Sequence, residues 1–285
     1  MEYHPHDLSK PFDDNGYAKF LPAISGFYIK QINKVRKDPT FYDPERIPSG
    51  LEYGIDGMDF FKKEGSYFFY KYGLYSAGHA RRDLPRAIEE ECMIHKRNRD
   101  DTVLVGDSGG YQLAKGIIKM DWDNAKDPHD PRREQLCGEI LEWLEGTSEW
   151  SMTLDIPAWM TAVPSLVEKT GLSSFDDALA MTQLNLDYFI EHRTPEKTKF
   201  LNVISGSDAA TSKKWYEGVK QYSDPDKIEE MGFDRDRTLE GYAFAGIHMR
   251  DMYVALSRIL DLIDDDLISD KDWRSEEHTS ELQSR

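Results

Sequence analysis

The sequence predicts an α/β fold with parallel strands, of the (β/α)8 TIM-barrel kind. Short apolar runs alternate with helical patterns along residues 102–263, which favours parallel strands joined by helical crossovers. Four of these runs end in a polar residue or glycine, at positions 107, 155, 205 and 246. Both barrels and doubly wound sheets build ligand sites at such strand ends. The barrel is the preferred prediction, and the doubly wound sheet is the alternative.

Before residue 100 the pattern of elements is weaker. Residues 1–60 are rich in proline, glycine and aromatic residues, which predicts loops with one short strand near residues 20–24. The aromatic run SYFFYK at residues 66–71 is typical of a strand. Residues 83–97 carry apolar residues at every fourth position, so we expect one amphipathic helix there.

From residue 102 strands and helices follow one another regularly. Short β-branched or apolar runs predict four strands, at residues 102–106, 151–154, 199–204 and 241–245. Apolar positions three and four residues apart predict four amphipathic helices, at residues 132–144, 173–192, 209–222 and 249–263. Each of these strands is therefore followed by a helix, which parallel strands need as a crossover.

The composition is that of one large domain. The 285 residues are 39% hydrophobic, and no Gly/Ser-rich linker divides them, so we expect one barrel domain over residues 1–273. No charged-then-apolar leader and no apolar run near 18 residues is present, so neither secretion nor a membrane partner is expected. Two cysteines cannot build a disulfide framework, which favours the reducing cytoplasm.

The segment RSEEHTSELQSR at residues 274–285 is unlike a natural protein end. It matches the in-frame translation of a common sequencing adaptor, so we exclude this tail from the fold prediction. The natural chain is expected to continue past about Trp273, which would leave the barrel incomplete and this fragment inactive.

The net charge argues against a general affinity for nucleic acid. The formal charge is −17, whereas phosphate binding normally needs a basic patch. Basic residues cluster at residues 81–86 and 95–99, which allows a local basic groove but is more typical of a solvated helix face.

The sharpest motif is GDSGGYQ at residues 106–112. Chymotrypsin-like proteases carry GDSGG around their nucleophile, and SAGHA at residues 76–80 resembles the segment around their histidine. The protease interpretation fails, because His79 precedes Ser108 by only 29 positions, whereas those enzymes place the two residues on separate barrels. The disulfides of that class are also missing from the sequence.

The motif instead resembles DSGG[FY]Q of the tRNA-guanine transglycosylases, the family of queuine and archaeosine transglycosylases. Three later segments resemble that family in the same order: SMTLDIPAW around Asp155, NVISGSD at 202–208 and YAFAGI at 242–247. The resemblance covers about residues 100–250; the first motif is fairly specific, and the others add weight through their order and spacing. It implies a TIM-barrel pentosyltransferase that replaces guanine in a nucleic acid with a 7-deazaguanine derivative.

Asp155, at the tip of a predicted strand, is the expected base-reading residue. Guanine and 7-deazaguanine present two donors along one edge, N1–H and the 2-amino group, and one ionised carboxylate can accept from both. The alternative is an aspartate that caps the next helix.

The resemblance also gives roles to the other motif residues. Asp107 would lie beside the sugar as an acid or base, although Asp-Ser-Gly-Gly is also a good tight turn. Tyr111 would stack on the base, worth about 1–3 kcal/mol, or lie in the core, and Gln112 would bond the base or cap a helix. The expected site residues are Asp107, Ser108, Gly109, Gly110, Tyr111, Gln112, Asp155, Ser205, Gly206, Ala245 and Gly246, with Asp107 the catalytic one.

The glycines of the expected site would act through their lack of a side chain. Gly109 and Gly110 would let backbone N–H groups approach the ligand. Gly246, with Ala245, would offer backbone groups to the 7-substituent, or would only permit close packing between strand and helix. Ser205-Gly206 stands where the family has Gln-Gly, and this departure puts the exact base in doubt.

In the resembled reaction an aspartate attacks the anomeric carbon, guanine leaves, and the incoming base displaces the enzyme. Family spacing places this nucleophile, and a structural zinc site, beyond Trp273. No metal is expected within residues 1–273, and the acidic run at residues 264–266 is expected to be a solvated helix end.

The partners that the resemblance implies are a nucleic acid, tRNA or DNA, and a free 7-deazaguanine base, with a homodimer as a possible state. The divergent first 100 residues and the Ser-Gly pair favour the DNA-modifying branch of phages and bacteria. Two other functions stay open. One is another barrel enzyme, such as a glycosidase using Asp107 and Asp155 as a carboxylate pair, and the other is a non-catalytic nucleic-acid-binding or assembly subunit.

Overall fold

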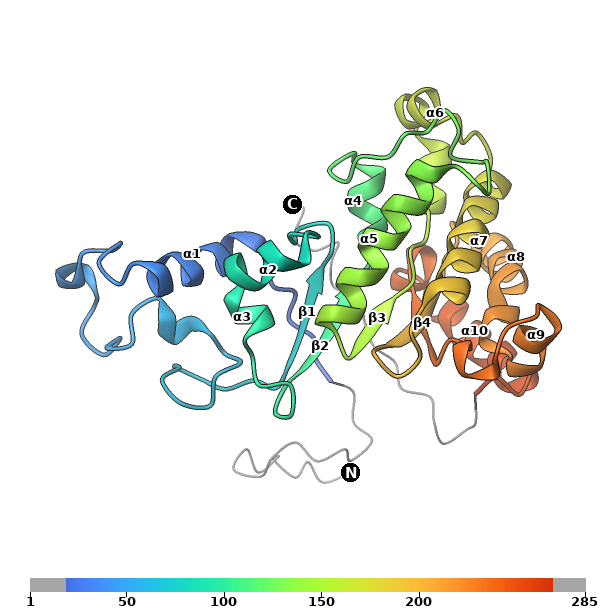
Figure 1. Cartoon of the computed structure of the whole chain (residues 1–285). Coiled ribbons are helices and arrows are strands. Elements are labelled where there is room, and N and C mark those ends of the chain that lie inside the picture. The colour runs from blue at the N-terminus through green and yellow to red at the C-terminus, as the bar shows by residue number, and fades with distance from the viewer. Residues whose placement is uncertain (1–18, 269–285) are drawn as a thin grey trace.

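A five-stranded parallel sheet forms the centre of the computed structural model, which describes residues 19–268 (Figure 1). The strands are β1 (Tyr72–Ser76), β2 (Val103–Asp107), β3 (Trp150–Met152), β4 (Lys199–Ile204) and β5 (Gly241–Phe244). Their order in the sheet is their order in the chain. The adaptor-like tail and the expected nucleophile and zinc ligands, placed past Trp273, lie outside the described residues.

Ten α-helices are present in the described part of the chain. They are α1 (Gly26–Lys37), α2 (Leu84–Glu90), α3 (Cys92–His95), α4 (Gly110–Ala114), α5 (Pro131–Thr147), α6 (Pro164–Thr170), α7 (Phe175–His192), α8 (Ala209–Val219), α9 (Pro225–Glu230) and α10 (Met252–Asp264). Helices α2, α5, α7, α8 and α10 contact one another in that order, as right-handed crossovers between sequential parallel strands require. A doubly wound sheet reverses its strand order, so that alternative does not fit the described sheet.

The two faces of the sheet carry different groups of apolar side chains. The helix-covered face packs Leu104 and Phe200 against large helical side chains such as Trp143 and Trp215. On the other face lie the side chains of alternate strand residues: Tyr72, Leu74, Val105, Met152, Leu201, Val203 and Ala243. Because strand side chains alternate between faces, the next residues along this second face are those at the strand tips.

Side-chain caps fix where the long helices begin. Ser174 and Asp177 form a capping box at the start of α7, and Asp208 accepts from the Thr211 N–H at the start of α8. Asp251 caps α10 in the same way. The loops between strand tips and helix starts therefore have fixed lengths, and these loops carry the candidate site.

Three sequence predictions for residues 1–71 were wrong in detail. Residues 1–60 were expected to hold no helix, but α1 forms, because Ser25 caps it and Ile29 and Ile32 pack into the core. The strand expected at residues 66–71 lies just downstream as β1, since YGLYS pairs with β2 while Phe68 stays exposed. The short strand expected near residues 20–24 is one parallel bridge, from Ala23 to Leu74.

The single helix expected at residues 83–97 is broken at Glu91. The Glu91 carboxylate is buried and accepts hydrogen bonds from the Tyr75 hydroxyl (2.9 Å) and the Arg81 N–H (3.0 Å). These bonds hold the residue between α2 and α3, where its backbone leaves helical geometry. A tertiary contact therefore overrides the helical period of the sequence.

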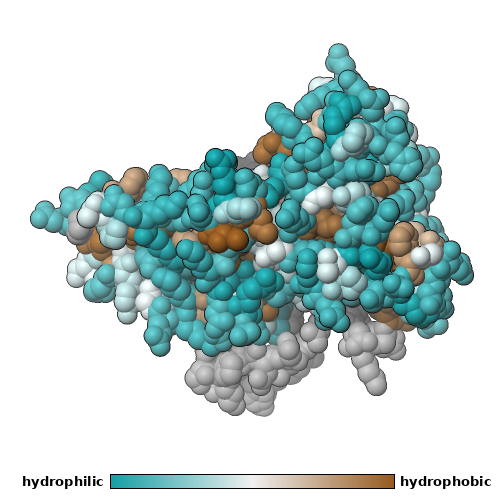
Figure 2. All heavy atoms as spheres, viewed as in Figure 1, coloured by the Kyte–Doolittle hydropathy of each residue, from teal (hydrophilic) through white to brown (hydrophobic). Residues whose placement is uncertain are grey.

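The face of the molecule in Figure 2 is mostly hydrophilic, in keeping with a chain in which 31% of residues are charged. Between residues 19 and 268 no helix has both the length and the apolar character needed to cross a membrane.

Candidate active site

A cavity of about 530 Å³ opens at the carboxyl ends of the strands. Its floor is apolar, from Met152, Val203 and Ala243 on the second face of the sheet. Eight of the eleven expected site residues line it: Asp107, Gly110, Tyr111, Asp155, Ser205, Gly206, Ala245 and Gly246. Residues that lie far apart in the chain meet here because parallel strands present their carboxyl ends at one edge.

The two aspartates meet in this cavity from neighbouring strand ends. Burial raises the pKa of Asp155 to about 7, and the negative charge of Asp107 raises it further in the same direction. Asp155 caps no helix, because α6 starts at Pro164 without a side-chain cap, so the capping alternative is wrong. A carboxyl group that titrates near neutral pH beside a second carboxylate is a candidate for acid–base chemistry.

Asp107 combines turn chemistry with its place in the cavity. Its Oδ1 accepts the Gly109 N–H at 3.1 Å, as in an Asx turn, so the tight-turn interpretation is confirmed. The side chain also lines the cavity, so this structural role leaves the expected functional one open.

The Gly-Gly pair of the motif is required by the approach of Asp155. A Cβ atom on Gly110 would lie 2.6 Å from the Asp155 carbonyl oxygen and 2.8 Å from its Oδ1. Gly109 adopts φ +88°, in the left-handed region that favours glycine. The two glycines therefore let α4 start directly against Asp155, a packing role that the sequence analysis did not foresee.

Ser108, Gly109 and Gln112 are the expected residues that do not line the cavity. The Ser108 hydroxyl donates to the Thr153 carbonyl at 3.0 Å and ties the end of β2 to the segment after β3. The buried Gln112 amide lies 3.2 Å from the His79 ring nitrogen and accepts from the Ser76 hydroxyl at 3.4 Å. Both side chains thus brace the strand tips.

The tip of β5 packs closely on the tip of β4. A Cβ atom on Gly246 would lie 2.4 Å from the Gly206 carbonyl oxygen, so this glycine permits a close approach between two strand ends, where the alternative expected close packing of a strand on a helix. The buried His248 fixes this turn, since its ring nitrogens lie 2.7 Å from the Ser212 hydroxyl and 2.7 Å from the Ala245 carbonyl.

One wall of the cavity is aromatic. The ring centroids of Tyr111 and Trp159 lie 6.0 Å apart at 48°, and the Lys115 ammonium lies 5.5 Å and 5.4 Å from them. Tyr111 is only partly buried, so it is not the core tyrosine of the alternative. Trp159, Lys115 and Arg250 also line the cavity and were not predicted from the sequence. The only signal was the position of Trp159, four residues after Asp155.

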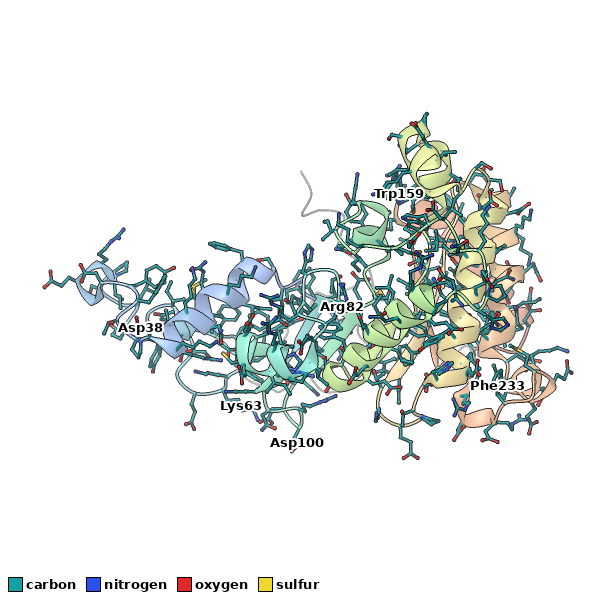
Figure 3. All side chains as sticks on the ribbon, turned by 45° about the horizontal axis from the view of Figure 1, so that its top comes forward. Asp38, Lys63, Arg82, Asp100, Trp159 and Phe233 are labelled. Carbon is teal, nitrogen blue, oxygen red and sulfur yellow. The ribbon has the colours of Figure 1, made fainter. Side chains whose placement is uncertain are left out.

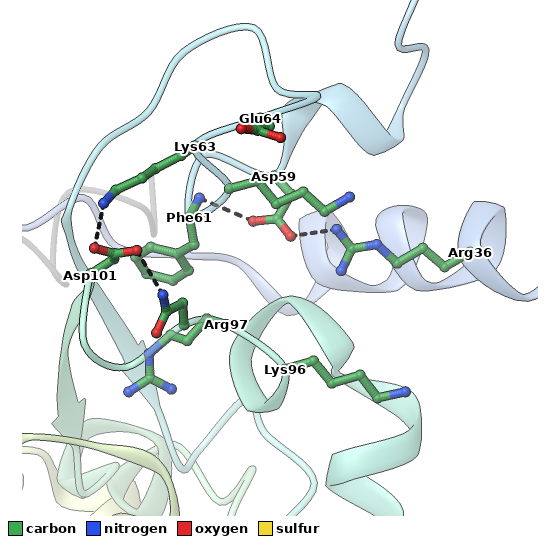
Figure 4. A pocket seen from close by; sticks show the side chains of 10 residues that line it. Arg36, Asp59, Phe61, Lys63, Glu64, Lys96, Arg97 and Asp101 are labelled. Carbon is green, nitrogen blue, oxygen red and sulfur yellow. Dashed lines mark hydrogen bonds and ion pairs between the residues drawn. The ribbon is translucent and has the colours of Figure 1, made fainter.

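A second, smaller cavity of about 320 Å³ lies beside the segment that leads into β2 (Figure 4). Its walls are highly charged, and two pairs of opposite charges face each other across it: Arg36 bonds Asp59 at 2.5 Å, and Lys63 pairs with Asp101. Such mutual pairing is typical of a structural ion-pair network, so the cavity at the carboxyl ends is the better functional candidate.

Within residues 19–268 no group of three His, Cys, Asp or Glu side chains is placed to hold a metal ion. Cys92 and Cys137 are separate buried thiols.

The fold and the cavity define the chain as an α/β protein with a two-carboxylate site at the carboxyl ends of a parallel sheet. No protein-family model and no curated protein matches the chain. A more specific function must therefore be argued from the site itself.

Proposed function

We propose that the cavity is the base-binding part of a base-exchange glycosyltransferase, which replaces guanine in a nucleic acid, tRNA or DNA, with a 7-deazaguanine derivative. The observation that carries this proposal is the meeting of Asp107 and Asp155 in one cavity, beside an aromatic wall. The fold proposed with it is the (β/α)8 barrel. Sequential strands and a row of helices in chain order support that fold, and two buried thiols fit a cytoplasmic enzyme.

Asp155 is the proposed base-reading residue. Its ionised carboxylate accepts hydrogen bonds from N1–H and the 2-amino group of the purine, which are charge-assisted and among the stronger ones in proteins. Without a ligand, burial favours the protonated form of this carboxyl. A ligand that offers two donors therefore draws Asp155 into its ionised form and releases a proton.

The remaining cavity residues suit a planar purine bound at its sugar end by Asp107. Tyr111 offers a partly exposed aromatic face for stacking. Ser205, Gly206, Ala245 and Gly246 have small side chains or none, which leaves room for a substituent at the 7-position. Asp107 acts on the sugar as an acid or base, while the attacking aspartate that the resemblance implies lies outside the described residues.

A glycosidase-like hydrolase is the second candidate. The observation that favours it is the raised pKa of Asp155 beside a second carboxyl group in one cavity, because hydrolases of sugars commonly use a pair of carboxyl groups, one of them an acid of raised pKa. The two candidates differ in ligand, since base exchange needs a purine and sugar hydrolysis needs an oligosaccharide.

Calorimetric titration of guanine and of a chitooligosaccharide into the protein tests both candidates. We expect guanine to bind and Asp155→Asn to weaken that binding by about 1.5–3 kcal/mol, the range for a hydrogen bond to a charged group. Asp236→Asn, at an exposed aspartate away from the cavity, is the matched control. Guanine affinity that is equal in all three proteins would remove Asp155 from the site, and oligosaccharide binding alone would favour the hydrolase.

A further inference from the structure

Two cations line the cavity without a carboxylate partner among residues 19–268: Lys115 and Arg250. Both side chains are exposed. The chain carries a net charge of −17, so carboxylates to pair with are abundant. Neither a purine nor a neutral nucleoside has a negative charge for these side chains to bind, so the proposed base pocket alone does not account for them.

Lys115 is held in place by the aromatic wall. It follows the last residue of α4, and its ammonium lies 5.5 Å from the Tyr111 centroid and 5.4 Å from that of Trp159. Trp159 belongs to a short 3-10 helix, Ala158–Ala162, which contacts α6, and it lies near α4 (Figure 3). The tilt of 48° keeps the two rings from stacking on each other, and the Trp159 ring is only partly buried.

Arg250 lines the same cavity from another strand end. It follows the 3-10 turn Gly246–Met249 after β5, whereas Lys115 follows β2 and α4. Strands β2 and β5 are three strand spacings apart in the sheet, or about 14 Å. The two cations therefore come from strand ends on either side of β3 and β4, and share the cavity with the two carboxylates.

We propose that Lys115 and Arg250 bind the phosphates on either side of the nucleotide whose purine enters the cavity. A neighbouring base stacks on Trp159. The inference rests on the proposed function, which already makes a nucleic acid the substrate, and adds three strand-binding residues to it. Phosphates are the groups that position a strand, whereas the carboxylates at the centre repel them, so the strand is held with its backbone at the rim and its purine inward.

A purine can enter the cavity in this way only from a single strand or when it is turned out of a duplex, because the stack otherwise hides it. Single-stranded RNA and single-stranded DNA share the chemistry that Lys115 and Arg250 recognise. Separate RNA and DNA arms of the experiment therefore identify which polymer binds.

The chain offers a matched control at the other end of the sheet. Lys199 starts β4, and its ammonium lies 4.9 Å from the ring centroid of Trp150 at the start of β3. This Lys–Trp pair has the same chemistry as Lys115 and Trp159 but lies at the amino ends of the strands. Lys199→Gln and Trp150→Leu therefore repeat the substitutions away from the cavity.

The test is fluorescence anisotropy with labelled 12-nucleotide RNA and DNA strands that contain one guanine, from 50 to 300 mM salt. Each lost phosphate contact lowers the slope of log K against log salt by about 0.7 for single strands. The double variant Lys115→Gln/Arg250→Gln should thus have a slope shallower by about 1.4 while Lys199→Gln keeps the wild-type slope. Trp159→Leu should weaken strand binding by about 5- to 150-fold, the range for one stacked base, and Trp150→Leu should not.

Titration of free guanine into the same proteins distinguishes the proposed guanine-binding function from the proposed strand-binding role of Lys115 and Arg250. Unchanged guanine affinity in the double variant, together with the shallower slope, supports the inference. Equal slopes in wild type, double variant and control would overturn it, as would a mononucleotide that binds as tightly as the strand. If the wild type binds strands through Lys115 and Arg250 but binds no guanine, the proposed function fails while the strand site stands.

Discussion

Replacing Asp155 with asparagine should make the stability of the protein respond differently to pH. The ordinary pKa of an aspartate is 3.8, and burial together with Asp107 raises that of Asp155 to about 7. Asparagine is close in shape and carries no charge at any pH. The substitution therefore isolates the free energy of ionising this one group inside the cavity.

The sign of the change in stability with pH follows from the direction in which the pKa of Asp155 is shifted. A raised pKa means that the folded state binds the Asp155 proton more tightly than the unfolded state does. Between pH 4 and 7 the unfolded state ionises freely while the folded state does not, so the wild type loses stability relative to the variant as pH rises. A shift of about 3 units at 1.36 kcal/mol per unit corresponds to about 4 kcal/mol.

The assay is urea unfolding of wild type, Asp155→Asn and the exposed control Asp236→Asn at several pH values from 4 to 8. The stability of Asp155→Asn relative to wild type should increase by up to about 4 kcal/mol across this range and level off above pH 7. A relative stability that stays constant with pH, or that moves in favour of the wild type, would refute the view that Asp155 is a half-buried carboxyl without a cationic partner among the described residues.

Three further predictions test the surroundings of Asp155. Gly110→Ala should destabilise the fold by about 1–3 kcal/mol, because the methyl group meets Asp155 at 2.6–2.8 Å; thermal unfolding measures this, with the helical Gly138→Ala as a milder control. Asp107→Asn should lower the pKa of Asp155, since a neighbouring negative charge is lost, and the midpoint of the pH dependence above should move down. Gln112→Ala should cost about 1 kcal/mol of stability with guanine affinity kept, because its amide braces His79; a selective loss of guanine affinity would instead place Gln112 in the site.

Much of the fold after residue 102 could be predicted from the sequence, because its strands are short apolar runs and its helices carry clear caps. Asp208 and Asp251, for example, both cap helices that the apolar spacing had indicated. The failures before residue 100 have a tertiary cause. The carboxylate of Glu91 bonds Tyr75 and Arg81 and interrupts a helix whose local pattern is continuous.

The candidate site was predictable only in part, for a similar reason. The motif GDSGGYQ and the ends of the predicted strands bring Asp107, Asp155 and Ser205 together from sequence alone, because parallel strand tips share one edge. Lys115 and Arg250 come from loops 135 positions apart, with no spacing that relates them. Only the sheet order, which places β2 and β5 on two sides of the cavity, makes them a pair.

The ionised carboxylate of Asp155 is the group in the cavity that hydrogen bonds from a ligand would stabilise most. Two buried arginines of the described chain have carboxylate partners: Arg97 bonds Glu149 at 2.7 Å, and Arg193 bonds Glu240 at 2.5 Å. Asp155 has no such cationic partner between residues 19 and 268, and its ionisation costs the folded state about 4 kcal/mol. Two hydrogen bonds to a charged acceptor contribute about 1.5–3 kcal/mol each. A ligand with two adjacent hydrogen-bond donors can therefore offset the whole cost of ionising Asp155, whereas a ligand with a single donor cannot. For this reason the donor edge of guanine suits the cavity better than a sugar hydroxyl does.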